Sequence, residues 1–593
     1  MSIRILMVAD YDDASFSYVS FGPTARPTPA HPSVGFNDWF GLSEVVSALQ
    51  SSPAPVTFTV TKAHRRDDPQ YPLGAPVPPG EEQFVPDLRN FRFDAPGLDL
   101  SLYDQIWLFG VATEDAPAKL DPSEVTAIFT FMQNGGGVFA TGDHWDMGAA
   151  LCGAVPRVRS MRRWYFGDQS QKLEGHDYDN DPVFIDALKG FSAPSAFGKF
   201  RHDTTQPDPP APVPPVIPFD LQSDKVPQPL RLEYVYSGNS FIEWKQPHPL
   251  LCSSEGDINV FPDHMHEGEA VVPWEWTRSY PVDGGPDAPE YPTSHFGTRG
   301  DGSPTVQPQV VAWASTVGGH TTSNAAGHTG ENVSPVVDEE FGAVGAYDGA
   351  AEGVGRVVVD STWHHFFDIN LIGDPASPVA ARRRGFQTPT VGGLVPDATL
   401  RKMRAYYRNI GLWLARPASQ LAVLADALAL IVGGQPFNEI ASAQAAYSDL
   451  LVAELGAQAA DKLRGLVTMC TSISAIHLIL YVLYPLPKFP PDPPCDPWWW
   501  QYLQPGDPTI GIIQPRGMAE TMLGGAVVEL LALRRAPEFR QQGRHDAKRV
   551  HEAVGRGLLR GREVYARGLE RTAKRYEEAA ARMQASQGQT EQR

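Results

Sequence analysis

Residues 105–144, QIWLFGVATEDAPAKLDPSEVTAIFTFMQNGGGVFATGDH, contain the pattern that decides the fold. The stretch opens with the apolar run QIWLFGV, which is typical of a strand that is covered on both faces. Asp121 and Pro122 then predict the start of a helix, the GGG run predicts its end, and residues 138–141 predict the next strand. A strand, a helix and a strand in this order favour two parallel strands in a sheet of the α/β class.

The same alternation of strands and helices extends in both directions from this stretch. Residues 37–50 carry apolar side chains along one helical face. Further strands are predicted at residues 3–9, 56–61, 309–315, 341–347 and 355–361. Proline-rich segments interrupt the alternation between residues 155 and 305 and predict a long insertion. We therefore expect an α/β domain over residues 1–390, built on a parallel sheet.

The composition changes after residue 390, where apolar residues recur at helical spacing. Residues 391–593 are therefore predicted to form an all-α domain. Its last helix, at about residues 545–583, is rich in arginine and carries a sparse apolar stripe. This pattern is typical of a solvated helix with one packed face, while the sharper interpretation is an arm that docks a protein partner. The segment after Met583 is expected to be disordered.

The composition argues against several kinds of partner and location. The 593 residues carry a formal net charge of −20, and an acidic surface repels nucleic acid. The four cysteines form no CxxC pair, which argues against a disulfide framework or a thiolate zinc site and predicts reduced thiols in the cytoplasm. The first residues resemble a buried strand and lack the features of a signal peptide. The apolar residues 466–484 include several polar side chains, so we expect a buried helix there and no membrane span.

Polar side chains follow several predicted strands at the point where each strand ends. Because the carboxyl ends of parallel strands meet at one edge of a sheet, we expect these side chains to gather there. The expected catalytic residues are Asp143, His144, His364, His365 and Asp368. The expected substrate-binding residues are Asp10, Asp12, Glu114, Arg157 and Trp363. One histidine or carboxylate of this group would act as a general base on a small polar molecule.

Residues 261–269, FPDHMHEGE, crowd two histidines between two acids. In an extended segment, His264 and His266 point to the same face and could hold one ion together with Asp263 and Glu267. Imidazole and carboxylate ligands without thiolate best suit zinc or iron, and water bound to such an ion becomes a nucleophile near neutral pH. The alternative is that these side chains bind loops or substrate hydroxyls directly.

Five segments carry a resemblance to a known superfamily: ILMVAD, YDQIWLFG, FMQNGGGVFATGDH, HPLLCSSEGDINVFPDHMHEGE and GVGRVVVDSTWHH. They resemble the class I glutamine amidotransferase-like superfamily and are most similar to its trehalose-utilisation (ThuA-like) branch. The resemblance covers about the first 370 residues without the insertion. It implies a flavodoxin-like sheet, a site at the turn after residues 138–141 and a carbohydrate-linked role.

Members of the superfamily that hydrolyse glutamine carry a cysteine nucleophile at this turn. This chain has the sequence TGDH there, and Cys152 comes a turn or more too late. Because no thiolate is available to form the acyl-enzyme, glutamine amidotransferase activity is not expected.

Two functions follow as hypotheses. The first is a hydrolase-like, metal-assisted enzyme that acts on a small polar or carbohydrate-type substrate at the carboxyl edge of the sheet. The second is a catalytically inactive module of the same fold, which docks a protein partner through the insertion and the helical domain.

Overall fold

The computed structural model describes the chain in a series of segments separated by gaps. The described residues are 2–12, 17–23, 38–68, 70–113, 119–143, 146–164, 204, 216–218, 226–239, 242–263, 267–273, 275–317, 321–323, 334–335, 338–373, 383–434, 437, 447–466, 515–536 and 547–590. Four residues of the expected sites, Glu114, His144, His264 and His266, lie outside these segments.

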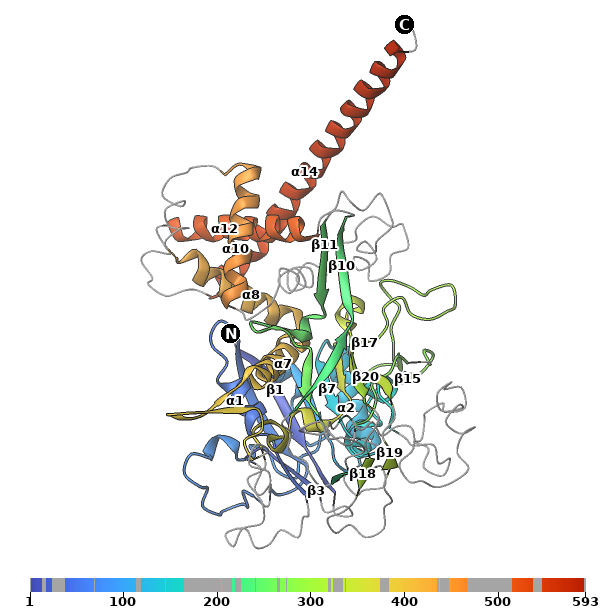
Figure 1. The fold of residues 1–593 in the computed structure, drawn as a ribbon, viewed down its shortest axis with the longest axis vertical. Coiled ribbons are helices and arrows are strands. Elements are labelled where there is room, and N and C mark those ends of the chain that lie inside the picture. The colour runs from blue at the N-terminus through green and yellow to red at the C-terminus, as the bar shows by residue number, and fades with distance from the viewer. Residues whose placement is uncertain are drawn as a thin grey trace.

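The central element is a nine-stranded sheet with the strand order β14-β9-β17-β20-β21-β7-β6-β1-β5 (Figure 1). Its strands are β14 (Val260–Pro262), β9 (Pro227–Leu232), β17 (Gln309–Thr316), β20 (Glu339–Tyr347), β21 (Val357–Asp360), β7 (Gly137–Thr141), β6 (Gln105–Phe109), β1 (Ser2–Ala9) and β5 (Thr57–His64). The five strands from β21 to β5 pair in parallel, and the other four join the sheet by antiparallel pairing. The expected α/β class is confirmed, and the structure shows a large central sheet.

The antiparallel part of the sheet differs from the expected parallel arrangement. Only residues 348–356 connect β20 to β21, which is too short for the helical crossover that parallel neighbours require. Strands β9 and β14 come from the predicted insertion, so the insertion supplies one margin of the sheet.

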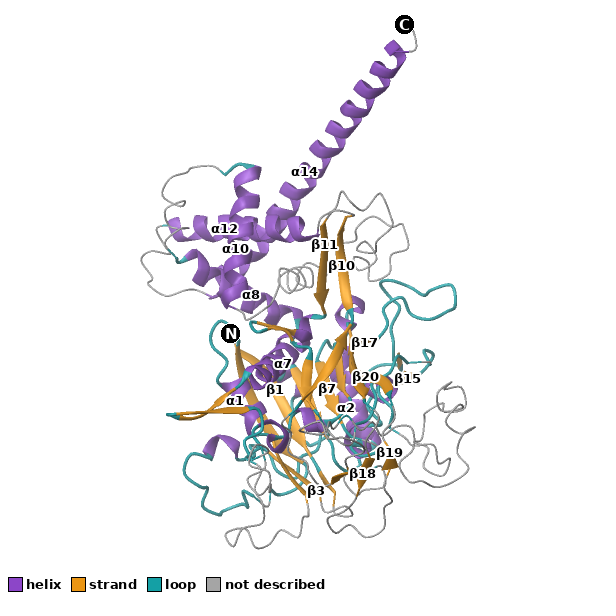
Figure 2. Ribbon diagram, viewed as in Figure 1, coloured by secondary structure: helices purple, strands orange, loops and turns teal. Residues whose placement is uncertain are grey.

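Helices lie on both sides of the parallel strands (Figure 2). Alternate side chains of these strands enter two separate cores. On β6, Ile106 and Leu108 belong to the core that contains α2 (Pro122–Gln133). Trp107 and Phe109 belong to the core that contains α1 (Ser43–Gln50) and α7 (Ala398–Leu414). Every residue of β6 is buried, because helices cover both faces of the strand.

The helix starts show where local sequence signals succeed and where they fail. The capping box that Asp121 and Glu124 form at the start of α2 agrees with the predicted helix start. The helix expected over residues 37–50 is shorter than predicted, because Asp38–Gly41 forms strand β4 instead. β4 pairs with β3 (Ser17–Ser20), and this pairing outweighs the helical spacing of its apolar residues.

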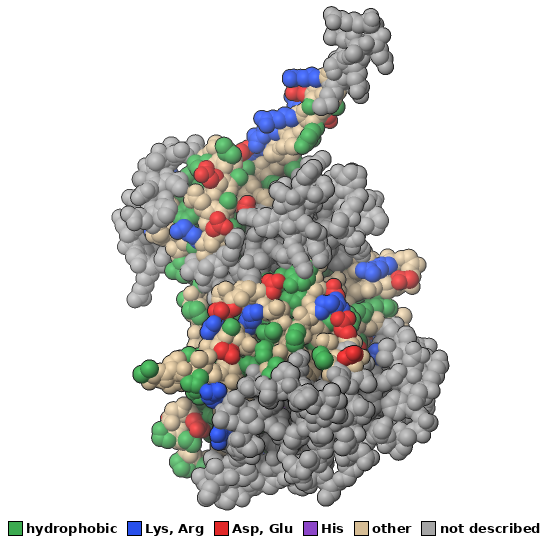
Figure 3. Space-filling view, in the orientation of Figure 1, with side chains coloured by type: hydrophobic (Ala, Val, Ile, Leu, Met, Phe, Trp, Pro, Cys, Tyr) green, Lys and Arg blue, Asp and Glu red, His purple; other side chains and the backbone are tan. Residues whose placement is uncertain are grey.

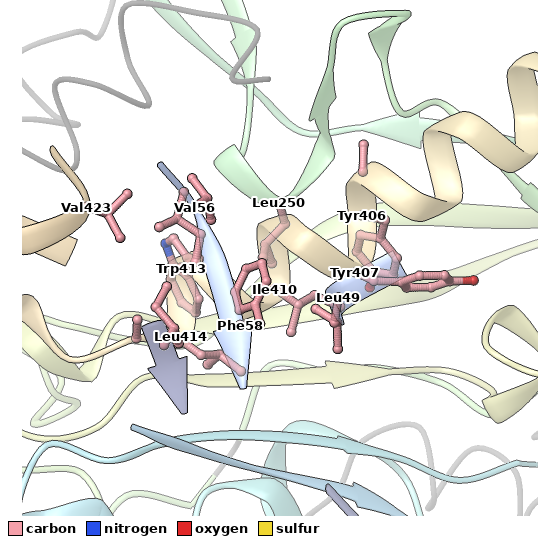
Figure 4. Packing of buried hydrophobic residues seen from close by; sticks show 14 of the residues in the cluster. Leu49, Val56, Phe58, Leu250, Tyr406, Tyr407, Ile410, Trp413, Leu414 and Val423 are labelled. Carbon is pink, nitrogen blue, oxygen red and sulfur yellow. The ribbon is translucent and has the colours of Figure 1, made fainter. Parts of the chain in front are cut away.

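Helix α7 lies on the sheet although it begins after the predicted domain boundary at residue 390. Figure 4 shows Tyr406, Tyr407 and Trp413 of α7 among apolar side chains of α1 and β5. Arg356, which precedes β21, donates to the backbone oxygen of Trp413 over 2.7 Å. The first helix of the predicted C-terminal part therefore covers one face of the α/β layer.

The remaining helices form a compact group beside the sheet and one long projection (Figure 1). They are α8 (Pro417–Val432), α10 (Asp449–Leu466), α12 (Pro515–Arg535) and α14 (Ala547–Thr590). Glycines bring their backbones close together: a Cβ added to Gly557 of α14 would lie 2.3 Å from Cα of Ala526 in α12. Beyond Val564, Arg567 and Arg571 of α14 still pair with Asp449 of α10. The helix then projects from the group with exposed charged side chains and continues to Thr590, past the predicted helix end (Figure 3).

The smaller elements are short strands and one-turn helices. They are β2 (Tyr11–Asp12), β8 (Val216–Pro218), β10 (Tyr234–Asn239), β11 (Ile242–Pro247), β12 (Cys252–Ser253), β13 (Gly256–Asp257), β15 (Ser279–Tyr280), β16 (Ala288–Pro289), β18 (Thr321–Ser323), β19 (Ser334–Pro335), β22 (Gln387–Thr390), β23 (Gly393–Pro396), α3 (Ala149–Cys152), α4 (Val158–Met161) and α6 (Asp368–Leu371). Among the described helices, none by itself has the length and apolar character needed to cross a membrane; only α7 and α8 reach that character together, and they are bent by 118°.

Candidate functional site

Three loops meet at the carboxyl ends of β7 and β21. Trp363, in the loop after β21, donates its backbone N–H to the oxygen of Gly142 after β7 over 2.8 Å. Gly268, in the loop after β14, donates its backbone N–H to the oxygen of Ser361 over 3.0 Å. These contacts bring together Asp143, Glu267, Asp360, His364 and His365, which we call the acid–imidazole cluster.

His365 lies at the centre of this cluster and is completely buried. Its Nδ1 is 2.7 Å from Oδ1 of Asp360, and the carboxylate can only accept, so Nδ1 carries the proton. The other carboxylate oxygen of Asp360 accepts a hydrogen bond of 2.7 Å from the hydroxyl of Tyr406 on α7. These two bonds fix the ring and its tautomer, as in the carboxylate–histidine pairs of many active and metal sites.

The second ring nitrogen of His365 faces Glu267. Nε2 is 3.7 Å from Oε2 of Glu267 and has no hydrogen-bond partner among the described residues. Glu267 also accepts from the hydroxyls of Thr204 (2.7 Å) and Ser361 (3.1 Å). The carboxylate is therefore held in place and directed at the imidazole.

Burial and neighbouring charges raise the pKa values of both Glu267 and His365. Burial raises the pKa of Glu267 to about 7, against the opposing effects of His365 and of the two hydroxyls. Burial alone would lower the pKa of His365, but the carboxylates of Asp360 and Glu267 outweigh it and raise that pKa. A carboxyl group with a pKa near 7, such as that of Glu267, can accept or release a proton near neutral pH, which general acid–base catalysis requires.

A second acid and imidazole lie beside the first pair. Asp143 accepts from the Thr362 hydroxyl over 2.9 Å, and its other oxygen is 3.7 Å from Nε2 of His364. Nδ1 of His364 is 2.8 Å from Oδ1 of Asn370, an acceptor, so this nitrogen also carries a proton. The expected grouping of Asp143, His364 and His365 at one edge of the sheet is thus present in the structure.

A buried arginine that the sequence analysis did not single out as a site residue ties these loops together. Arg162 donates to the backbone oxygens of Asp143 (2.5 Å), Ser361 (2.6 Å) and Asp360 (3.1 Å). Burial lowers the pKa of its guanidinium to about 10. Its hydrogen bonds go to main-chain oxygens, so it fixes the ends of β7 and β21 relative to each other.

The turn after β7 is built around Gly142. A Cβ at this position would lie 2.5 Å from the backbone oxygen of Met147 and 2.7 Å from the ring of Trp164. Such distances are shorter than non-bonded atoms allow, so only glycine fits between the two loops. The glycine in this turn is therefore required by packing.

Asp10 and Cys152 lie behind the same edge. Oδ1 of Asp10 accepts from the backbone N–H of Val111 over 2.6 Å, while Oδ2 has no partner within the described segments. Burial raises the pKa of Asp10 to about 7. Burial also raises the pKa of the Cys152 thiol, whose sulfur is 3.6 Å from the backbone oxygen of Thr141. This thiol is kept protonated, the form that is the poorer nucleophile.

Other expected site residues have structural contacts instead. Asp368 caps α1, where it accepts from the hydroxyl of Ser43 (2.7 Å) and the backbone N–H of Glu44 (2.9 Å). The Trp363 ring lies 6.0 Å from the ring of Phe367, within apolar packing. Asp12 is buried in β2.

Arg157 and Asp263 complete the placement of the expected residues. Arg157 is buried next to Glu290, to which its Nε donates at the backbone oxygen over 2.7 Å. This places Arg157 outside the acid–imidazole cluster. Asp263 is buried directly after β14, four residues before Glu267.

Within the described segments, no group of three or more His, Cys, Asp or Glu side chains is arranged to hold a metal ion. Two of the four expected ligands, His264 and His266, lie outside these segments. The donor atoms that are present, Nε2 of His365 and the carboxylate of Glu267, have the chemistry that zinc or iron accepts. The hydrogen bond from Nδ1 to Asp360 is also the usual outer contact of a metal-bound histidine.

In comparisons with known proteins, no family model, no curated protein and no solved structure matches this chain.

Proposed function

We propose that the chain is an enzyme of the hydrolase type that acts on a small polar or carbohydrate-type molecule at the acid–imidazole cluster. The observation that carries the proposal is His365, which is held by Asp360 on one nitrogen and faces Glu267 with the other. In this proposal His365 takes a proton from the attacking water and then gives it to the leaving group, while the carboxylate of Glu267 stabilises the protonated ring. Asp360 and Tyr406 orient the ring and do not exchange protons with substrate.

A divalent metal, zinc or iron, is part of the proposal for the loop after β14. Asp263, His264, His266 and Glu267 would hold it, and the ion would lower the pKa of a bound water. The acid and imidazole groups around Glu267 support this assignment by their chemistry.

We further propose a flavodoxin-like arrangement related to the class I glutamine amidotransferase-like superfamily, placed in the cytoplasm and followed by an all-α domain. The five neighbouring parallel strands and the cluster at their carboxyl ends support this relationship. The buried, protonated Cys152 is consistent with an activity other than glutamine hydrolysis.

One observation favours the alternative of a catalytically inactive docking module. Every residue of the acid–imidazole cluster is at most 2% exposed, so the cluster also has the properties of a structural network that orders three loops. A protein partner would then dock through the insertion or the C-terminal helices, of which α14 offers an exposed charged surface (Figure 3).

A hydrolysis screen distinguishes the enzyme from the docking module. It tests nitrophenyl esters, phosphates and glycosides as substrates of the parent and of two variants. His365→Gln removes the proton carrier, whereas Tyr407→Phe, the matched control, removes a hydroxyl that donates only to a backbone oxygen over 2.7 Å. The proposal expects turnover in the parent and the control and its loss in His365→Gln. Turnover that survives in His365→Gln, or no turnover in any of the three proteins, contradicts it and favours the docking module.

A further inference from the structure

Another buried arginine, Arg157, has charged donors without acceptors. Its side chain is completely buried just before α4, and its Nε donates to the backbone oxygen of Glu290 over 2.7 Å. Its two terminal nitrogens, Nη1 and Nη2, have no hydrogen-bond partner anywhere in the described segments. A guanidinium cannot be neutralised by losing a proton under ordinary conditions, so burying four N–H donors and a charge without an acceptor is costly.

The nearest carboxylate does not supply the missing counter-charge. One oxygen of Glu290 accepts from the backbone N–H of Arg157, and the other accepts from the guanidinium of Arg159. Glu275 lies 3.4 Å from Arg159 and 2.9 Å from Arg278, so it also serves other cations. The charge of the Arg157 guanidinium is therefore uncompensated at hydrogen-bonding distance within the described segments.

Aromatic rings enclose the guanidinium. Its central carbon is 5.5 Å from the ring centre of Phe129 and 5.7 Å from that of Tyr347. The Tyr347 hydroxyl is buried as well and has no partner among the residues that the structure describes. Two rings of this kind attract the cation but supply no hydrogen-bond acceptor in its plane.

This location is separate from the acid–imidazole cluster. Tyr347 pairs with Val357 at the start of β21, whereas Asp360 is the last residue of that strand. Arg157 therefore lies near the start of β21, whereas the cluster lies at the carboxyl end of this strand.

We propose that Arg157 binds a small monovalent anion inside the protein, with Nη1, Nη2 and the Tyr347 hydroxyl as its donors. A chloride-sized ion or a small carboxylate offers the negative charge and the acceptor atoms that the surrounding residues lack. A water molecule would satisfy some donors but would leave the buried charge uncompensated. The anion would stabilise the connection between α4 and the segment that carries Glu290.

The test measures urea unfolding at constant ionic strength while sodium chloride replaces sodium isethionate, whose anion is much larger. For the parent, each tenfold rise in chloride above the dissociation constant is expected to raise the folding equilibrium constant about tenfold. Arg157→Gln should lose this response, and Tyr347→Phe should shift it to higher chloride. The matched control is Arg163→Gln, which removes a neighbouring arginine that has its own partner, Glu269, at 2.7 Å and should keep the parent response.

Two outcomes overturn the proposal: the absence of any response to chloride and to formate in the parent, or the same response in Arg157→Gln. A series with formate in place of chloride separates a halide site from a carboxylate site. If Arg157→Gln does not fold, crystals of the parent soaked in bromide decide the matter. An anomalous peak beside Arg157 supports the proposal, and its absence there contradicts it.

Discussion

Two adjacent tyrosines on α7 allow the contribution of the charged cluster to be measured directly. Tyr406 and Tyr407 are both completely buried, and both hydroxyls donate hydrogen bonds of 2.7 Å. The acceptor of Tyr406 is the carboxylate of Asp360, while the acceptor of Tyr407 is the backbone oxygen of His365. Replacement by phenylalanine removes one oxygen atom in each case, so the difference between the two variants reports the charge of the acceptor.

The expected magnitudes follow from this difference. A bond to a neutral acceptor contributes about 0.5–1.5 kcal/mol, and a bond to a charged acceptor contributes about 1.5–3 kcal/mol. Tyr406→Phe should therefore lower the free energy of unfolding by about 1–2 kcal/mol more than Tyr407→Phe. The backbone N–H of Thr362, at 3.3 Å, and Nδ1 of His365 remain as donors to the other carboxylate oxygen of Asp360, Oδ1.

The assay is urea unfolding followed by tryptophan fluorescence at pH 7, with each variant also made in an Asp360→Asn background. In that background the acceptor is neutral, so the cost of Tyr406→Phe should fall to that of Tyr407→Phe. Equal costs for the two variants in the parent background would refute the view that Tyr406 stabilises a buried carboxylate. A cost for Tyr406→Phe that does not change with Asp360→Asn would refute it as well.

Three further predictions concern other parts of the site. Burial raises the pKa of Asp10 from 3.8 to about 7, so between these pH values the folded state binds one proton more than the unfolded state, and stability falls by on the order of 4 kcal/mol as the pH rises through them. Asp10→Asn should remove this part of the pH dependence when the urea midpoints at pH 5 and pH 8 are compared. An unchanged difference between the two midpoints would count against this prediction. Gly142→Ala should lower the free energy of unfolding by about 1–3 kcal/mol or more, because the added Cβ meets a backbone oxygen at 2.5 Å. The control Gly300→Ala, with no atom within 4 Å of its Cβ, should change stability by about 0.5 kcal/mol or less. Similar shifts of the melting temperature for both variants would contradict the packing argument. Mass spectrometry of the untagged parent is expected to find zinc or iron at near-stoichiometric levels. The His264→Ala/His266→Ala variant should lose this metal while its circular dichroism spectrum stays that of the parent. A parent protein that stays metal-free after reloading with zinc or iron would rule out this ligand set.

The sequence contained enough information to predict the parallel half of the sheet. Continuous apolar runs mark strands that are buried on both faces, as β6 and β7 are. The direction of a strand leaves no such mark, because alternation shows which face a side chain joins and not which neighbour the strand pairs with. The antiparallel pairing of β17, β20, β9 and β14 therefore required the structure.

The site was predictable to the same partial extent. The rule that polar residues after parallel strands converge led to Asp143, His364 and His365. It also covers Asp360, the last residue of β21, which was overlooked because it ends an apolar run. Tyr406 is 46 residues away in the sequence and reaches the cluster only because α7 packs on the sheet, a contact that local patterns do not encode.

The close glycine contacts between α12 and α14 give the long helix the mechanics of a lever. Near Gly557 and Gly561 the two backbones touch, so the crossing is a short, stiff fulcrum with few adaptable side chains. Arg571 of α14 still pairs with Asp449 of α10, and from Arg571 to Thr590 the helix extends a further ~28 Å at 1.5 Å per residue. A tilt of about 10° of this part would move the tip by roughly 5 Å. A spectroscopic label near Arg582 would therefore amplify small rearrangements of the helical group into displacements that distance measurements resolve.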